Sequence, residues 1–199
     1  MVEKCKGWKR MNTKRDKIIA SAEKLIAQYG FRKTTMEEIA AAAGMSKSAM
    51  YYYYKSKEDI FEAIIKKDSN EFKRKINEAV SLSETPQEKI LHYIQARMQH
   101  LKEVSIYYTT LNDEYLDHYF FVEEARKSFY SFEASKLKMF LEEGEENNNF
   151  VIDDIEITIW MISTVIKGLE FSLLVKDSGY DSITVSEKIM NIIFRGLNS

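Results

Sequence analysis

The sequence has few of the residues that form disulfides, metal sites and tight turns. Its 199 residues include one Cys, one Pro, seven Gly and three His. A lone Cys5 excludes an internal disulfide and a cysteine metal site, and so few Gly and Pro disfavour an all-β fold. The histidines are scattered, and no phosphate-binding glycine loop or serine nucleophile motif is present. We therefore expect no metal site, no cofactor and no enzyme.

Long apolar runs are also absent. The N-terminal residues are charged and lack the apolar segment of a signal peptide. Near the C-terminus the longest uncharged run, 157–166, has 10 residues, whereas a membrane-spanning helix needs about 20. These features predict a soluble, cytoplasmic protein that does not associate with membranes.

The chain does contain ample apolar residues and an uneven distribution of charge. Apolar residues make up 45% of the chain, which is enough for a packed core. Residues 1–57 carry 13 Lys+Arg against 5 Asp+Glu, whereas residues 58–199 carry 16 against 26. A basic N-terminal part favours a polyanionic partner such as nucleic acid. Charge alone leaves open the alternative that the asymmetry only serves solubility.

Apolar periodicity and capping signals predict an all-α fold of about nine helices, without strands. Capping boxes, in which a Ser or Thr is followed three residues later by an acid, mark five helix starts: Thr13/Asp16, Thr35/Glu38, Ser56/Asp59, Thr85/Glu88 and Thr184/Glu187. The expected helices are 14–29, 36–43, 47–53, 57–80, 86–102, 104–118, 121–143, 153–176 and 185–196, with a loop at 142–149. We expect a domain of residues 1–56 followed by a larger one of 57–199.

Residues 35–57 have the pattern of a helix-turn-helix. Gly44 stands where the chain must reverse, a position that favours a positive φ, and Ser46 is placed to cap the following helix. Met50 and Tyr54 are four residues apart and are expected to pack inward. Four consecutive tyrosines cannot all face inward on a helix, so some must be exposed beside the lysines. Exposed tyrosines favour a binding surface over a purely structural subdomain.

The side chains left outside are the candidate DNA-binding residues. Lys47 is suited to guanine acceptors and Ala49 to a thymine methyl group, while tyrosine hydroxyls and Lys57 suit phosphate oxygens. Because this face has no Arg, Asn or Gln, we expect little direct base readout and more dependence on phosphate contacts and DNA shape. The full set is Thr35, Ser46, Lys47, Ser48, Ala49, Tyr51, Tyr52, Tyr53 and Lys57.

The segment resembles the N-terminal domain of the TetR family of transcriptional regulators. The similarity extends over about 50 residues and rests on Ile18–Ile19, Gly30–Phe31, Thr34–Thr35, Ile39–Ala40, Ala43–Gly44, Ser46–Lys47, Tyr51–Tyr54 and Lys55–Glu58. Ser48, Tyr52 and Tyr54 depart from the family's common residues. The resemblance implies a homodimeric repressor that binds a double-stranded operator and is released by a small-molecule effector. It further implies a four-helix interface formed by the last two helices, and a pocket among the middle helices.

The helix expected at 153–176 is apolar on nearly every side and therefore needs two packing partners. Its own core and a second subunit would provide them, and a dimer also matches a two-fold operator. The alternative is a core helix of a monomer. The expected interface residues are Ile159, Ile162, Ile166, Ile189, Ile192 and Ile193.

The middle of the chain is rich in aromatic residues and Met, which belong either to a core or to an apolar pocket. Arg97 is able to pair with an anionic head group, or equally with Asp113 or Glu114. Gly168 marks either a close helix approach or room for a ligand. A small, largely apolar effector is expected, with a protein partner as the alternative. The candidate ligand-binding residues are Ile94, Arg97, Met98, Tyr107, Tyr108, Leu111, Tyr115, Phe129, Trp160, Thr164 and Gly168.

Overall fold

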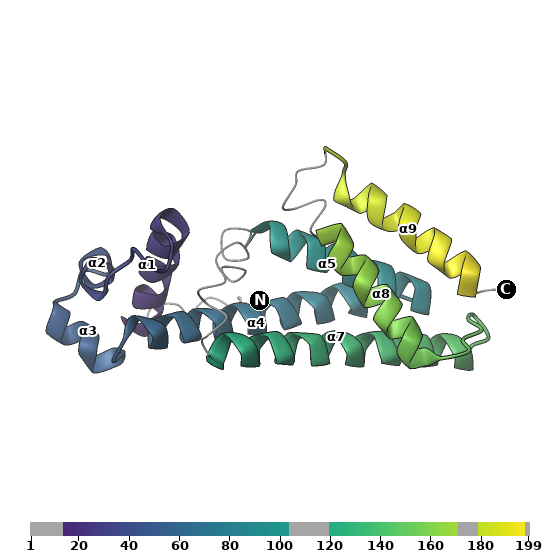
Figure 1. Ribbon diagram of the computed structural model, residues 1–199, viewed down its shortest axis with the longest axis horizontal. Coiled ribbons are helices and arrows are strands. Elements are labelled where there is room, and N and C mark those ends of the chain that lie inside the picture. The colour runs from purple at the N-terminus through teal and green to yellow at the C-terminus, as the bar shows by residue number, and fades with distance from the viewer. Residues whose placement is uncertain (1–13, 104–119, 171–178, 198–199) are drawn as a thin grey trace, which may run out of the picture. The chain divides into compact units, whose positions relative to one another are not determined.

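The computed structural model describes residues 14–103, 120–170 and 179–197, and these form helices and no strand, which confirms the all-α prediction (Figure 1). The helix expected at 104–118 lies outside the described residues. Within the described ranges, no helix is long and apolar enough to cross a membrane. The helices are α1 (Lys14–Tyr29), α2 (Met36–Ala42), α3 (Lys47–Tyr53), α4 (Lys57–Ser81), α5 (Pro86–Glu103), α7 (Phe120–Glu146), α8 (Ile155–Glu170) and α9 (Ser182–Leu197).

Two of the five predicted capping boxes form at helix starts. At the start of α2, the Thr35 hydroxyl accepts from the Glu38 backbone N–H at 3.3 Å, and the Glu38 carboxylate accepts from the Thr35 N–H at 2.8 Å. Thr85 and Glu88 form the same reciprocal pair before α5. Because each cap satisfies backbone donors that the first helical turn leaves open, a local motif is enough to start the helix.

Of the other three predicted capping boxes, one forms in part, one is wrong and one lies partly outside the described residues. Ser56 accepts from the Asp59 N–H at 3.1 Å, but the Asp59 carboxylate accepts from the Lys55 N–H at 3.0 Å instead of completing the box. The box at Thr184 is wrong, because Asp181 accepts from the Thr184 N–H at 2.8 Å and α9 starts at Ser182. The box at Thr13 includes a residue outside the described ranges.

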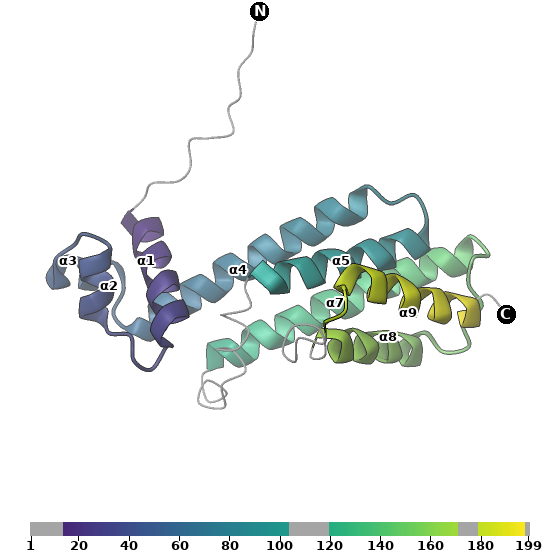
Figure 2. The ribbon, with the colours of Figure 1, turned by 90° about the horizontal axis from the view of Figure 1, so that it is seen from above.

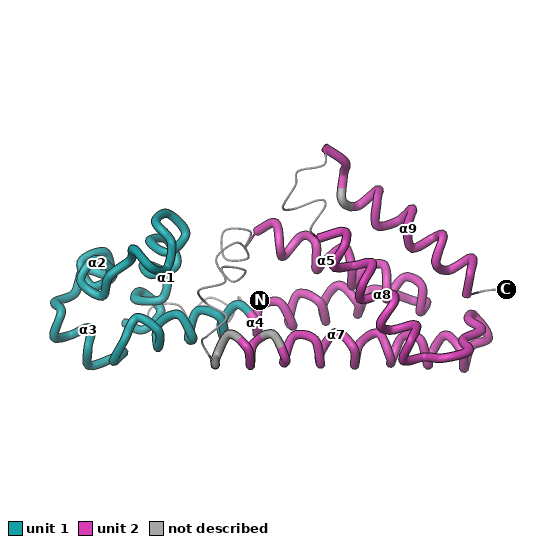
Figure 3. Tube along the Cα trace, in the orientation of Figure 1, with its two compact units in different colours: residues 1–68, 110–122 teal, residues 69–109, 123–199 magenta. Residues whose placement is uncertain are grey.

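The chain divides into two compact units, which Figure 3 shows in different colours. Unit 1 comprises residues 1–68 and 110–122, and unit 2 comprises 69–109 and 123–199. The helix α4 begins where the sequence predicts the second domain and contributes residues to both units. The described core of unit 1 joins α1, α2, α3 and the start of α4 through Ile18, Ala22, Ile26, Ile39, Met50, Ile60, Phe61 and Ile64.

The helix α5 is the central element of unit 2. In Figure 2 it runs between α7 and the second part of α4. Side-chain contacts bind it to each neighbour: Lys75 of α4 pairs with Glu103, Lys89 pairs with Glu143 of α7, and Gln95 donates to Glu187 of α9 at 3.3 Å. Its buried face carries Ile90, Tyr93, Ile94 and Met98, which pack into one core with residues of α7, α8 and α9.

The loop predicted at 142–149 begins later than expected, because α7 continues to Glu146. Glutamates favour a helix, and Gly144 is accommodated within it for a packing reason. A Cβ added to Gly144 would lie 2.0 Å from the Phe150 ring. Phe150 in turn stacks on Phe194 of α9 with ring centroids 5.9 Å apart. The glycine therefore allows the segment after α7 to fold back and close this end of the core.

Candidate nucleic-acid interface

The orientation of α3 is fixed by two buried side chains and by the turn before it. Met50 is fully buried and Tyr54 is 7% exposed, as their spacing predicts. Gly44 has a φ of +68°, and the Met45 N–H donates to the Ala40 carbonyl at 2.9 Å. Ser46 caps α3 by accepting from the Ala49 N–H at 3.2 Å. These contacts hold α3 against α1 and α2 and leave its opposite face open.

The open face carries the predicted tyrosines. Tyr52 is 83% exposed and Tyr51 is 44% exposed, whereas Tyr53 is half-buried. The Tyr52 and Tyr53 rings meet edge to face, with centroids 5.2 Å apart. Thr35, Ser46, Lys47 and Ser48 are exposed and Ala49 is half-buried. The structure thus gathers eight of the nine predicted residues on or beside the accessible side of α2 and α3.

Sequence reasoning missed Glu37, which lies in the first turn of α2. Its carboxylate forms an ion pair with the ammonium of Lys47, and both side chains are more than half exposed. The hydrogen bond from Lys47 lowers the pKa of Glu37, and the same bond raises the pKa of Lys47. The available signal was the presence of opposite charges at the starts of two short helices that a glycine turn brings together.

The ninth predicted residue, Lys57, has an intramolecular role. Its ammonium donates to the carbonyl oxygens of Phe31 at 2.7 Å and Thr34 at 2.8 Å, with a longer contact to Arg32 at 3.4 Å. It also lies 4.4 Å from the centroid of the Phe31 ring, a cation–π distance. In this arrangement the donors of Lys57 hold the turn after α1.

A basic residue of α1 also contacts the end of α3. The Arg15 guanidinium lies 5.3 Å from the centroid of the Tyr54 ring. Partial burial raises the pKa of Tyr54, with Arg15 opposing that shift. The phenol is therefore neutral at physiological pH, and this contact brings positive charge from α1 to the end of α3.

In unit 2, Arg97 is part of a buried polar cluster. It pairs with Glu133 of α7 and Glu170 of α8, and all three side chains are 2% exposed. Tyr93 donates to Glu133 at 3.1 Å, and burial raises the pKa of Tyr93 to about 12. The predicted partners Asp113 and Glu114 lie outside the described residues. Sequence reasoning missed both glutamates, because no local pattern links them to α5.

The predicted ligand-binding residues do not form one lining in the described part of unit 2. Ile94 and Met98 are buried in the core, and the half-buried Phe129 ring lies 4.6 Å from the Arg97 guanidinium. Trp160 is 69% exposed, and Thr164 and Gly168 are exposed on the same side of α8. The structure therefore does not bring these three together with Ile94 and Met98 in the described core. The remaining candidates, outside the described residues, are Tyr107, Tyr108, Leu111 and Tyr115.

The predicted dimer-interface residues of α8 lie on its inward side. Ile159, Ile162 and Ile166 are buried in the core of unit 2, each no more than 6% exposed. On α9, Ile189 and Ile193 are half-buried and Ile192 is exposed. Because α8 is apolar on nearly every side, its sequence does not indicate which side faces the core; we call this the phase of the helix.

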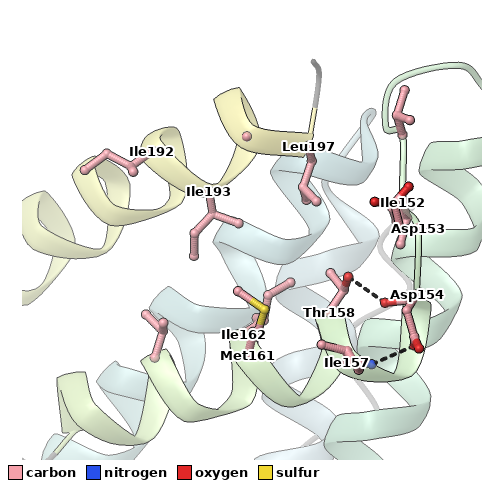
Figure 4. Close-up of a pocket in the computed structure, with 13 residues that line it drawn as sticks. Ile152, Asp153, Asp154, Ile157, Thr158, Met161, Ile162, Ile192, Ile193 and Leu197 are labelled. Atoms are coloured by element: carbon pink, nitrogen blue, oxygen red, sulfur yellow. Dashed lines mark hydrogen bonds between the residues drawn. The ribbon is translucent and has the colours of Figure 1, made fainter.

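The exposed side of α8 borders an apolar groove of about 540 Å³ shared with α9 (Figure 4). Its lining includes Met161 and Ile162 from α8 and Ile193 and Leu197 from α9. Asp154 stands at one end, where its carboxylate caps α8 by accepting from the Ile157 N–H at 3.0 Å. Among the residues that the structure describes, no group of acidic, His or Cys side chains is placed to hold a metal ion.

Comparisons with known proteins agree with this arrangement. Residues 18–64 match the family model of bacterial regulatory proteins, tetR family. The uncharacterized HTH-type transcriptional regulator YhgD of Bacillus subtilis (strain 168) is 23% identical over 186 residues, covering 92% of this chain and 95% of YhgD. The fatty acid metabolism regulator protein of the same strain is 22% identical over 196 residues, covering 95% of this chain and 100% of that protein.

The fold is shared with solved structures. The transcriptional regulator FadR from Bacillus subtilis in complex with stearoyl-CoA superposes with a TM-score of 0.72 at 22% identity, covering 91% of this chain and 98% of that one. At this identity the likeness concerns the fold, which by itself does not specify a ligand.

Proposed function

We propose that this chain, whose residues 18–64 match the model of the tetR family of bacterial regulatory proteins, is a homodimeric repressor of that family. It binds a double-stranded operator through α2 and α3, and it leaves the operator when a small, largely apolar effector binds the body formed by unit 2. On this proposal the protein acts in the cytoplasm, with residues 1–56 as the DNA-binding domain.

The observation that carries the DNA-binding part is the division of α3 into two faces. Met50 and Tyr54 anchor the helix, while Lys47, Tyr51 and Tyr52 extend from it. The exposed hydroxyls and ammonium suit phosphate oxygens and the major-groove edge of guanine. We assign the contacts to Thr35, Ser46, Lys47, Ser48, Ala49, Tyr51, Tyr52 and Tyr53, and leave out Lys57 because its donors already have backbone partners.

The exposed side of α8 supports a homodimer. Ile157, Trp160 and Met161 are each more than half exposed and share one side of the helix, and Ile192 of α9 is 72% exposed. Apolar side chains gathered in this way beside a groove are typical of a protein–protein interface. A second copy of the chain, related by a two-fold axis, would cover the face and present two α3 helices to a two-fold operator. A different protein in this groove is the alternative.

A lipid-like effector is supported by the relatives, one of which is named a fatty acid metabolism regulator and another of which was solved with stearoyl-CoA. In unit 2 the apolar side chains of Ile94, Met98 and Phe129 lie beside the polar cluster of Arg97. We propose that the effector enters here and favours a conformer of the dimer in which the spacing of the two α3 helices no longer fits the operator. Release follows only if effector and DNA prefer different conformers.

The DNA-binding part is tested with Lys47→Ala combined with Tyr52→Ala. The probe is a duplex that the wild-type protein selects from a random-sequence pool, and its affinity is measured at fixed salt. Loss of the Lys47 and Tyr52 contacts should weaken binding at least tenfold, because a good contact to a base edge alone contributes about 1–3 kcal/mol. The control is Tyr29→Ala, a half-exposed tyrosine at the end of α1. Unchanged affinity of the double variant would overturn the assignment.

The same complex tests the effector. A long-chain acyl-CoA should release the wild-type protein from the selected duplex, whereas acetyl-CoA, which carries the same head group without the apolar chain, should not. Retention of DNA at saturating long-chain acyl-CoA, with binding of that compound shown by calorimetry, would contradict the proposed repressor mechanism.

A further inference from the structure

The ion pair between Glu37 and Lys47 places a negative charge at the surface that is expected to meet DNA. Lys47 is the first residue of α3, and Glu37 lies in the first turn of α2. Their charged groups are in direct contact, and the two side chains are 61% and 53% exposed. No apolar packing explains the pair, since both side chains extend into solvent.

We propose that Glu37 limits the affinity of this protein for DNA by competing with DNA for Lys47. The inference rests on the proposed function, in which Lys47 is a DNA contact. Lys47 has one ammonium, so a contact with phosphate or guanine takes it from the carboxylate. The carboxylate then loses its partner, so each DNA contact made by Lys47 is weakened by the free energy of the ion pair that it breaks.

The size of the effect follows from the exposure of the pair. Exposed ion pairs change an equilibrium constant by about two- to fivefold, which is weak enough for DNA to break the pair. Breaking it also leaves a carboxylate that attracts its own counterion, and this offsets the counterion that Lys47 releases from the DNA. Glu37 should therefore reduce both the affinity and the salt dependence of binding.

Other carboxylates of unit 1 are differently placed. Glu38 is held by the cap of α2, and Glu23 pairs with Lys67. Glu62 is exposed on α4. A Glu62→Gln variant changes the net charge by the same amount as Glu37→Gln, so the difference between the two variants reports the position of the charge.

The test measures the affinity of full-length wild type, Glu37→Gln and Glu62→Gln for a random-sequence duplex across a series of salt concentrations. Glu37→Gln should bind about two- to fivefold more tightly per recognition helix, and the slope of log affinity against log salt should steepen by about one per helix. In a Lys47→Gln background, Glu37→Gln should raise the affinity for DNA no more than Glu62→Gln does. Circular dichroism checks that α2 is retained.

Two results would overturn the inference. One is equal affinity and salt slope for Glu37→Gln and Glu62→Gln. The other is a gain from Glu37→Gln that persists in full without Lys47, since the carboxylate would then act on phosphate directly and not through the lysine. Failure of the wild-type protein to bind any duplex would instead overturn the proposed function, so the two failures are distinguishable.

Discussion

At the scale of single residues, side chains of one type acquire different roles from small differences in position. Tyr52 is 83% exposed, whereas Tyr54, two positions later, is 7% exposed and anchors α3. Lys47 extends from the start of α3, whereas the ammonium of Lys57 points back to the turn after α1. The periodicity of a helix predicts the first difference. The second depends on which backbone carbonyls lie nearby.

Replacement of Lys57 by Met should destabilise the protein. The change keeps most of the apolar stem but removes donors to the carbonyls of Phe31 and Thr34. Hydrogen bonds to charged donors contribute about 1.5–3 kcal/mol, so the free energy of unfolding should fall by about 1–3 kcal/mol. Urea unfolding of the full chain measures this free energy. The exposed Lys55 offers a matched control, and Lys55→Met should change the same quantity by less than about 0.5 kcal/mol. Equal effects of the two variants would argue against the role of Lys57.

At the scale of elements, some features of a helix follow from its own sequence, and others depend on residues that pack against it. α2 and α5 start at capping boxes that satisfy the backbone locally. α7 continues through Gly144 because Phe150, which follows the helix, occupies the place of the missing side chain. Local signals thus decide where these two helices start, and a tertiary contact explains why α7 carries a glycine near its end.

Gly144→Ala provides a test of that contact. Alanine is the better helix former, so the substitution would stabilise an isolated helix by about 1 kcal/mol. Here the added methyl group would collide with the Phe150 ring, and overpacking of this kind costs about 1–3 kcal/mol. We expect a net loss of stability in thermal unfolding. In a Phe150→Leu background, where the ring is absent, the loss should shrink or reverse; an equal loss there would point to another cause.

At the scale of the whole molecule, the side of α8 that faces outward determines how the proposed dimer forms. Ile159, Ile162 and Ile166 complete the core of unit 2, so the surface left for a second copy carries Ile157, Trp160 and Met161. Trp160 was expected in a pocket, but its 69% exposure places it on the surface proposed for the dimer. Large aromatic residues of this kind commonly dominate binding energy at an interface.

Trp160→Glu should therefore produce a monomer. Loss of a central tryptophan costs about 2 kcal/mol or more in binding, and a buried carboxylate adds to that penalty. Sedimentation at micromolar concentrations should show dimers for wild type and monomers for the variant. Leu82→Glu makes a similar change at an 80% exposed site between α4 and α5 and should remain dimeric. A wild-type protein that sediments as a monomer would contradict the homodimer, and a dimeric Trp160→Glu would contradict this interface.

The sequence by itself determined the starts of α2 and α5 and the inward and outward sides of α3. Both follow from short-range rules: caps act over three residues, and residues such as Met50 and Tyr54 face one side because they are four apart. The boundary at residue 57 and the effector remain predictions. Tertiary structure alone decided the phase of α8 and the partners of Arg97. A helix that is apolar all round carries no preferred side, and Glu170 is 73 residues from Arg97, so only the packing of α5 against α7 and α8 brings the two charges together.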